Sequence, residues 1–336
     1  MLKNKNFYKT AVNDFLKKIN FKKRINYNFS SCDICDQKNF TIITSKSLLS
    51  SDQNLYCYLP VVNCLSCGHS QQLIKFDKKF YSLYYSKYIE KNILTKKNIK
   101  KRFLNSIKRG AVLKSFLERR LNSNFDNKKI LDVGCGYGGM LYPFAKKGSK
   151  TFGVDPDKNA IDYGKKHNKL TKLQSIGAES MKFKKKYFDL IIINGSLEHV
   201  YDMNIVLQKA SSYLKNNGIL FLEGKGYPLD IIENFFNFNH HRIFTKKTFD
   251  NVGIKYNIKS IYSSYNSQLS DLKSIFAHSH QKNYKLLKKN YKKNKKGNLI
   301  WLGKKQNLRG KTKYKKDHFI IKHYKLNNYI KLNHKN

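Results

Sequence analysis

The chain has 336 residues, of which 40% are hydrophobic and 26% are charged, and its formal net charge is +45. This length and apolar content allow one large domain with one or two small modules. No apolar run approaches about 18 residues, and the first residues lack the apolar core of a secretory signal, so we expect a cytoplasmic protein without a transmembrane segment.

The positive charge has two interpretations. It would attract a polyanion such as RNA, DNA or an anionic membrane surface. However, the lysines are spread along the whole chain, and the other abundant residues also have AT-rich codons, which favours compositional drift. The basic ends are residues 1–29, a predicted partly amphipathic helix, and the tail 305–336. The dense runs Lys288–Lys296 and Arg309–Lys316 fit either solvated segments or phosphate contacts.

Residues 30–76 contain two C-x-x-C pairs, Cys32 with Cys35 and Cys64 with Cys67. Each pair can hold two thiolates on one tight turn, and two such turns complete a tetrahedron around Zn²⁺. Disulfides or ordinary buried thiols are the alternatives, but disulfides require an oxidising compartment. We therefore predict a structural zinc module, in which four protein ligands leave no open position for chemistry.

Residues 77–125 are predicted to form a helical bridge that leads into the main domain. The bridge opens with an aromatic cluster, Phe80–Tyr88, of a kind that is more often a packing surface than a ligand site. The periodicity of the apolar residues from Phe103 to Leu117 then indicates a helix.

A glycine-rich loop follows the first predicted strand. The apolar run Lys129–Leu131 leads into Asp132-Val-Gly-Cys-Gly-Tyr-Gly138, where a ligand can lie against bare backbone. Asp155 closes the second strand, at a position suited to accept hydrogen bonds from two ribose hydroxyls. These features predict a nucleoside site. The loop also fits the dinucleotide pattern, so NAD competes, but the Asp132 carboxylate favours the cationic end of S-adenosylmethionine (SAM) over a pyrophosphate.

Helices alternate with the predicted strands, which favours a parallel α/β sheet with crossover connections. Residues 263–297 are predicted to be a long polar insertion before the last strand. The core strands are expected near residues 129–133, 150–155, 172–176, 187–194, 218–224, 255–262 and 298–303.

Two further segments complete the pattern: Tyr187–Val200 runs from a buried strand into a polar loop, and Leu214–Glu223 contains a turn and another strand. In order and spacing, residues 126–304 resemble the class I SAM-dependent methyltransferases. The resemblance implies a Rossmann-like, seven-stranded α/β sheet. It also implies that 298–303 is an antiparallel edge strand. Four aromatic residues of the bridge become candidates for a lid over the cofactor: Tyr81, Tyr84, Tyr85 and Tyr88.

Carried over residue by residue, the resemblance implies a cofactor site at the carboxyl ends of the strands. Asp132 would lie near the amino end of the methionine moiety, and Asp155 would hold the ribose. The other expected contacts are Gly134, Cys135, Gly136 and Gly138 in the glycine loop, Pro156, Ala178 and Glu179 around the adenine, and Asn194, Ser196, Leu197 and Glu198 beneath the sulfonium.

A hydroxyl or carbon acceptor needs a general base. The rule that ligands bind beyond the carboxyl ends of the strands nominates His199, with Lys225 and Tyr227 after the fifth strand. His240 and His241, on a later loop, are the second choice. A structural role for the Glu198–His199 pair, closing the cofactor pocket, is the alternative.

The four-cysteine module followed by a SAM domain also resembles bacterial methyltransferases of sugar and polysaccharide biosynthesis. This implies a small-molecule or glycan acceptor, methylated on a hydroxyl or, second, a carbon of a nucleotide-linked sugar. A zinc-containing RNA methyltransferase is the alternative, because a zinc module and basic charge also fit nucleic acid. The segment Asn194–Leu197 lacks the Asn/Asp-Pro-Pro-aromatic signature of amino methylation.

Overall fold

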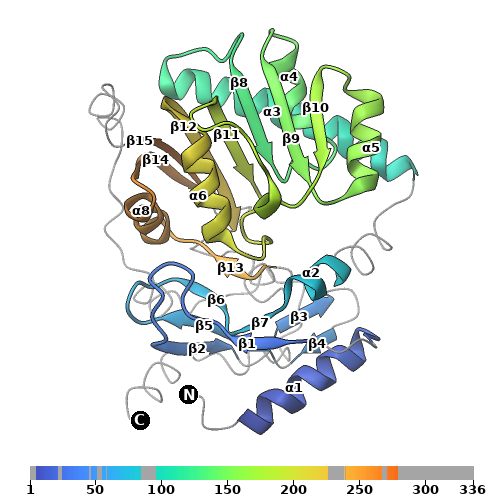
Figure 1. The fold of residues 1–336 in the computed structure, drawn as a ribbon, viewed down its shortest axis with the longest axis vertical. Coiled ribbons are helices and arrows are strands. Elements are labelled where there is room, and N and C mark those ends of the chain that lie inside the picture. The colour runs from blue at the N-terminus through green and yellow to red at the C-terminus, as the bar shows by residue number, and fades with distance from the viewer. Residues whose placement is uncertain are drawn as a thin grey trace.

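A computed structural model describes residues 5–21, 25–44, 47–50, 55–57, 59–84, 96–225, 238, 240–266 and 271–278. Figure 1 shows a larger α/β part above a smaller part that is rich in strands and is built from the N-terminal residues. Among these residues, no helix combines the length and the apolar character needed to cross a bilayer.

The larger part is built on a seven-stranded sheet, which confirms the predicted fold class. The first five strands in sheet order are parallel, and the sixth is antiparallel to both of its neighbours. In sheet order the strands are β10 (Thr171–Ser175), β9 (Lys150–Asp155), β8 (Lys129–Val133), β11 (Phe188–Asn194), β12 (Leu214–Lys225), β15 (Asp271–His278) and β14 (Ile258–Asn266).

The antiparallel strand is not where the sequence predicts it. The predicted edge strand at 298–303 lies outside the described residues. The structure instead forms β15 within the predicted insertion 263–297, and places it between β12 and β14. The apolar run Ile275–Ala277 is fully buried in the sheet, but it is short and flanked by polar residues, so its sequence signal is weak.

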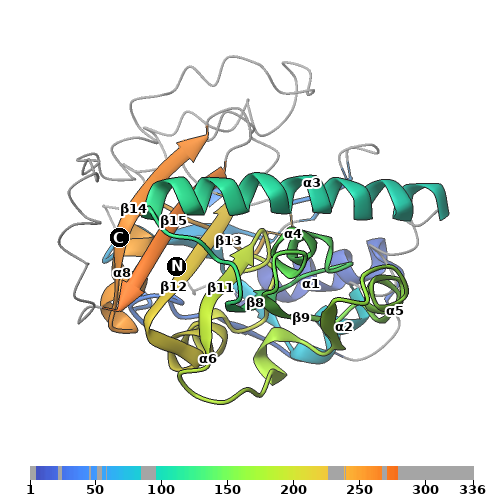
Figure 2. The same ribbon diagram turned by 90° about the horizontal axis from the view of Figure 1, so that it is seen from above.

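Both faces of the sheet are covered, which explains the continuous apolar run in β11. Ile191 and Ile193 pack on one face in the core that includes α6 (Met203–Tyr213) and α8 (Lys246–Lys255). Ile192 packs on the other face, in the core that includes α3 (Lys96–Leu121). Figure 2 shows α3 lying along one side of the sheet and α6 on the opposite side.

Short helices and side-chain caps complete the larger part. Asp202 accepts hydrogen bonds from two backbone N–H groups at the start of α6, and the Thr245 side chain accepts one at the start of α8. The remaining helical segments are α4 (Tyr142–Ala145), α5 (Lys158–His167) and the 3₁₀ turns Gly139–Leu141 and Ala178–Ser180.

The N-terminal part consists of small antiparallel sheets with α1 (Lys5–Lys18) and α2 (Lys78–Tyr84) packed against them. β1 (Tyr27–Phe29) pairs with β7 (Ile74–Phe76), β3 (Ser47–Ser50) pairs with β4 (Leu55–Cys57), and a four-stranded sheet has the order β13 (Arg242–Ile243), β6 (Ser70–Gln72), β5 (Val61–Cys64) and β2 (Phe40–Thr44). Because β13 comes from the later part of the chain, it ties the two parts together.

Candidate functional site

The glycine loop after β8 has the shape of a ligand cradle. Gly134, Gly136 and Gly138 have φ angles of 79°, 52° and 68°, which favour glycine. A Cβ atom added at Gly136 would meet no other atom within 4 Å, so the space beside it is open to a ligand. The Gly136 N–H donates to Asp155 Oδ2 at 2.8 Å, and Asp157 N–H donates to the other oxygen at 2.9 Å. The Asp155 carboxylate is thereby held at the rim of the loop.

Asp132 lies at the base of the same loop and is 2% exposed. Burial, reinforced by the charge of Asp155 and opposed by Arg109, raises the pKa of Asp132 to about 7. A carboxylate in this position gains most from a cationic partner, and the ammonium group of SAM is such a partner.

Arg109 is a site residue that the sequence analysis missed. It extends from α3, and its Nη2 donates to Asn194 Oδ1 at 2.7 Å, while its charge acts on Asp132. Nothing in the sequence separates this arginine from the many other basic residues of α3. Only the packing of α3 across the sheet brings it to the end of β11.

Several predicted cofactor residues turn their side chains elsewhere. The Cys135 thiol packs in the core beside Gly153, and Leu197 is 1% exposed in the opposite core, so only their backbones can meet a ligand. Ser196 Oγ donates to the Val133 carbonyl at 2.7 Å and packs on Gly134. Around the expected adenine position, Ala178 is buried and Pro156 is exposed. Glu179 Oε1 accepts from the Asp202 N–H at 3.2 Å.

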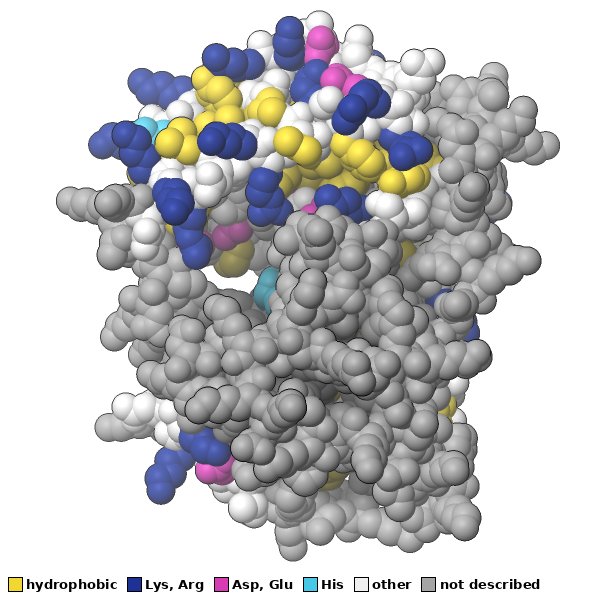
Figure 3. Space-filling model, turned by 180° about the vertical axis from the view of Figure 1, so that it is seen from behind, with side chains coloured by type: hydrophobic (Ala, Val, Ile, Leu, Met, Phe, Trp, Pro, Cys, Tyr) yellow, Lys and Arg dark blue, Asp and Glu magenta, His cyan; other side chains and the backbone are white. Residues whose placement is uncertain are grey.

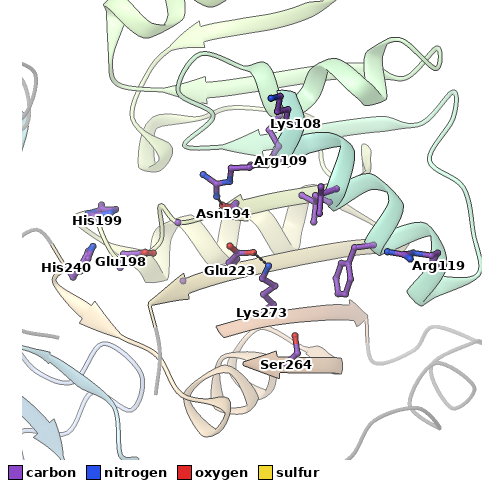
Figure 4. A pocket seen from close by; sticks show the side chains of 16 residues that line it. Lys108, Arg109, Arg119, Asn194, Glu198, His199, Glu223, His240, Ser264 and Lys273 are labelled. Carbon is purple, nitrogen blue, oxygen red and sulfur yellow. Dashed lines mark hydrogen bonds and ion pairs between the residues drawn. The ribbon is translucent and has the colours of Figure 1, made fainter. Parts of the chain in front are cut away.

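A pocket of about 880 Å³ opens where β11 and β12 end and extends along α3 (Figure 4). Val112, Leu113, Phe116 and Met140 form its apolar wall. Its polar wall contains residues from the ends of the strands and from the loops beyond them: Asn194, Glu198, His199, Glu223, His240 and Lys273. This combination suits a small organic molecule with a polar reacting group.

Glu198, His199 and His240 form a cluster at one end of this pocket (Figure 4). One carboxylate oxygen and one imidazole nitrogen from each histidine lie within 4.8 Å of one another. The ring centroids of His199 and His240 are 5.1 Å apart. Such a set can exchange protons with a bound hydroxyl or hold a cation.

His241 does not share the pocket with the other two histidines. Its ring is 6% exposed and lies 4.3 Å, centroid to centroid, from the ring of Tyr81, at the contact with the N-terminal part. Its backbone N–H donates to the Glu198 carbonyl at 3.0 Å, and its own carbonyl accepts from Gln72 N–H at 2.9 Å. The predicted catalytic His241 thus lies outside the pocket that His240 lines, because residues 240 and 241 face different sides of the segment that leads into β13.

The remaining predicted residues are the lid tyrosines and the two residues expected after the fifth strand. Tyr81 and Tyr84 are buried, which fits a packing surface better than a lid, while Tyr85, Tyr88 and Tyr227 lie outside the described residues. The backbone of Lys225 is described as part of β12, but its side chain is outside the description.

Arg242 connects the pocket to the cysteine module. It is 2% exposed, and its Nε forms an ion pair with Asp33 Oδ2 at 2.5 Å. The same guanidinium donates to the carbonyls of Val200 at 2.6 Å and Tyr201 at 3.0 Å. Burial is the largest single influence on Asp33 and raises its pKa, but the charges of Arg242 and Lys75 and the hydrogen bond from Arg242 together outweigh burial and keep that pKa below its usual value. Because Asp33 stands between Cys32 and Cys35, the cysteine turn is held directly against the loop that carries His199.

The four predicted cysteines meet in space. The sulfurs of Cys32 and Cys67 are 3.4 Å apart, those of Cys35 and Cys64 are 3.5 Å apart, and all four lie within 4.8 Å of one another. A Zn–S bond of about 2.3 Å places the sulfurs of a tetrahedron about 3.8 Å apart, so the set fits a zinc ion. No disulfide joins them, since all six cysteines are free.

On the face shown in Figure 3, the described side chains fit compositional drift better than a binding surface for a polyanion. Figure 3 shows Lys and Arg side chains scattered among apolar ones over the described part of this face. A continuous basic surface of the kind that follows a nucleic-acid backbone is not present among these described side chains.

Comparison with known proteins identifies the larger part. The family model described as "Methyltransferase domain" matches residues 106–250, less than half of the chain. A Ubiquinone biosynthesis O-methyltransferase from Pelagibacter ubique is 34% identical over 114 residues, which are 33% of this chain and 48% of that protein. One of the same name from Bartonella tribocorum is 35% identical over 102 residues, covering 29% of this chain and 41% of that protein. The chain thus spans less than half the length of either relative.

Among solved structures, the 1,6-didemethyltoxoflavin-N1-methyltransferase of Burkholderia thailandensis with bound S-adenosylhomocysteine gives a TM-score of 0.42 at 13% identity, over 59% of this chain and 84% of that one. A TM-score this low adds no evidence on function. The family model supports the predicted methyltransferase domain over residues 106–250. The predicted link to sugar and polysaccharide biosynthesis is not supported, because these relatives are named for ubiquinone biosynthesis.

Proposed function

We propose that this chain transfers the methyl group of SAM to a hydroxyl oxygen of a small organic acceptor. The observation that carries this proposal is that Arg109 connects the glycine loop to the pocket. Arg109 lines the pocket, and its charge acts on Asp132 at the base of the loop. The cluster of Glu198, His199 and His240 lies at the far end of the same pocket. The names of the relatives favour oxygen as the acceptor atom over the sugar carbon that the sequence left open.

In this proposal SAM lies against Gly136, with its ribose on Asp155 and its methionine ammonium on Asp132. Arg109 lies close enough to the same end to meet the methionine carboxylate, which the sequence analysis did not anticipate. The cofactor supplies an activated methyl group, so the chain's own residues mainly hold donor and acceptor in line.

The methyl transfer forms one bond and breaks two. A lone pair of the acceptor oxygen forms a bond to the methyl carbon, the carbon–sulfur bond breaks with its electrons going to sulfur, and the hydroxyl proton leaves. Glu198, His199 and His240 are the described groups at the end of the pocket where that proton is lost. The zinc that the four cysteines would hold plays a structural part only, because its four ligands complete the tetrahedron.

Label transfer tests this function directly. Methyl-labelled SAM incubated with small phenols and other hydroxyl acceptors is expected to label the organic product, and His199→Ala should reduce turnover by about 10² to 10⁴ while leaving SAM affinity unchanged. Nucleotide sugars and bulk RNA serve as the other acceptors. Label found only in RNA, with a steep dependence of binding on salt, would restore the nucleic-acid alternative.

SAM affinity should depend on pH through Asp132. Its pKa of about 7 in the free protein falls when the ammonium of SAM binds, because the cation favours the ionised carboxylate. Binding therefore releases a proton below pH 7, and the affinity should weaken as the pH falls from about 7 towards 5, by up to about tenfold per unit. Calorimetry at several pH values measures this slope. Asp132→Asn should abolish it, and an unchanged slope in that variant would assign the titration to another group.

A further inference from the structure

We propose that Glu198, His199 and His240 together bind a divalent cation, which holds the acceptor oxygen during methyl transfer. This deepens the proposed function, because it names the way in which the same pocket would lower the pKa of the hydroxyl.

The three side chains come from separate segments but converge. Glu198 and His199 follow β11, and His240 precedes β13, yet their ligand atoms lie within 4.8 Å of one another. Bonds of about 2.0 to 2.2 Å to nitrogen and oxygen bring neighbouring ligands to about 3 Å from each other. Small rotations of the two half-buried imidazoles are enough to close that difference, since both face the open pocket.

The donor set is typical of a metal that does chemistry. Two imidazoles and one carboxylate leave coordination positions open, in contrast to the closed set of four cysteines. The carboxylate of Glu198 is 1% exposed, and a cation beside it would offset the cost of removing that charge from water. The open positions would face the pocket, where an acceptor oxygen can enter.

The backbone around the cluster is fixed on both sides. The Glu198 carbonyl accepts from the His241 N–H at 3.0 Å, and the His199 N–H donates to the Ser196 carbonyl at 3.0 Å. A Cβ atom at Gly224 would lie 3.2 Å from Glu198 Oε2, so this glycine leaves the space that the carboxylate occupies. These contacts therefore fix the backbone of the loop that carries Glu198 and His199 before any ion binds, and the imidazoles need only rotate.

With its oxygen on the cation, the acceptor hydroxyl loses its proton to water in the pocket more easily. The resulting oxyanion attacks the methyl carbon, and the carbon–sulfur electron pair passes to sulfur, which gives the methyl ether and S-adenosylhomocysteine. Two imidazoles and one carboxylate suit Zn²⁺, and the carboxylate together with water also suits Mn²⁺.

Mn²⁺ binding to the full, zinc-loaded chain tests the site. Mn²⁺ prefers oxygen and nitrogen to thiolate, so its electron paramagnetic resonance signal reports on this cluster and not on the cysteines. One bound ion is expected. Glu198→Gln and His240→Ala should each weaken binding at least about tenfold, whereas His167→Ala and Asp162→Asn, both on α5, should not.

Circular dichroism and thermal melting of the same variants show whether they are folded. No Mn²⁺ binding to the wild type, or equal binding in Glu198→Gln, would overturn the proposal and leave His199 as a general base. Mn²⁺ bound by the wild type and lost in the variants, with no methyl transferred to any hydroxyl, would support the cation site and count against the proposed function.

Discussion

Removal of metal from the four-cysteine cluster is expected to unfold the N-terminal module and to abolish turnover while SAM binding persists. Structural zinc contributes on the order of 10 kcal/mol of apparent folding free energy in small modules. Chelation removes the ion that holds the four cysteines together, whose sulfurs lie within 4.8 Å of one another. The strands of the module are short, so their pairing cannot replace the folding free energy that is lost with the zinc.

The core under α3 contains no residue of the module, so that side of the sheet and SAM binding should persist. The apolar residues of the module belong to the same core as α6 and α8, so their exposure should also lower the melting temperature of the larger part. Elemental analysis should find zinc in the wild type. Cys64→Ser should reduce it, and Cys57→Ala, which alters a buried cysteine outside the cluster, should not.

An unchanged melting curve after chelation of a zinc-loaded chain would show that the metal does not hold the module. A wild-type chain that never binds zinc would remove the structural role entirely.

The glycine loop and the cysteine cluster could be predicted from sequence because their determinants are local. Gly134, Gly136 and Asp155 belong to one strand–helix–strand unit, and each cysteine pair belongs to one tight turn. A few consecutive residues meet each physical requirement: the glycines allow positive φ angles, and each C-x-x-C pair supplies two thiolates.

The acceptor side could not be predicted in the same way, because its geometry depends on pairing between distant segments. Arg109 reaches the site only because α3 crosses the sheet, and His240 and His241 are assigned opposite roles by the pairing of β13 with β6. The strand β15 was missed for a related reason. The short apolar centre of β15 forms a strand because it pairs with β12 on one side and with β14 on the other.

The ion pair of Arg242 with Asp33 should be the most sensitive single contact between the two parts. Arg242→Met is expected to destabilise the fold by about 3 to 5 kcal/mol, because it leaves the Asp33 carboxylate and the carbonyls of Val200 and Tyr201 without their buried cation. Denaturant unfolding measures this loss. Turnover should fall more than SAM affinity, since the freed loop carries His199 and the glycine loop is untouched.

A double-mutant cycle separates the ion pair from general damage to the core. If the two side chains act together, Asp33→Asn combined with Arg242→Met should cost clearly less than the sum of the single changes. The matched control is Lys255→Ala, because Lys255 reaches Asp36 at 3.4 Å from α8, across the same boundary but at an exposed site. Exposed pairs contribute about 0 to 1 kcal/mol, so this variant should stay within that range. Additive single changes would mean that Arg242 acts through packing alone, and that the cysteine turn does not position the loop of His199 through this charge.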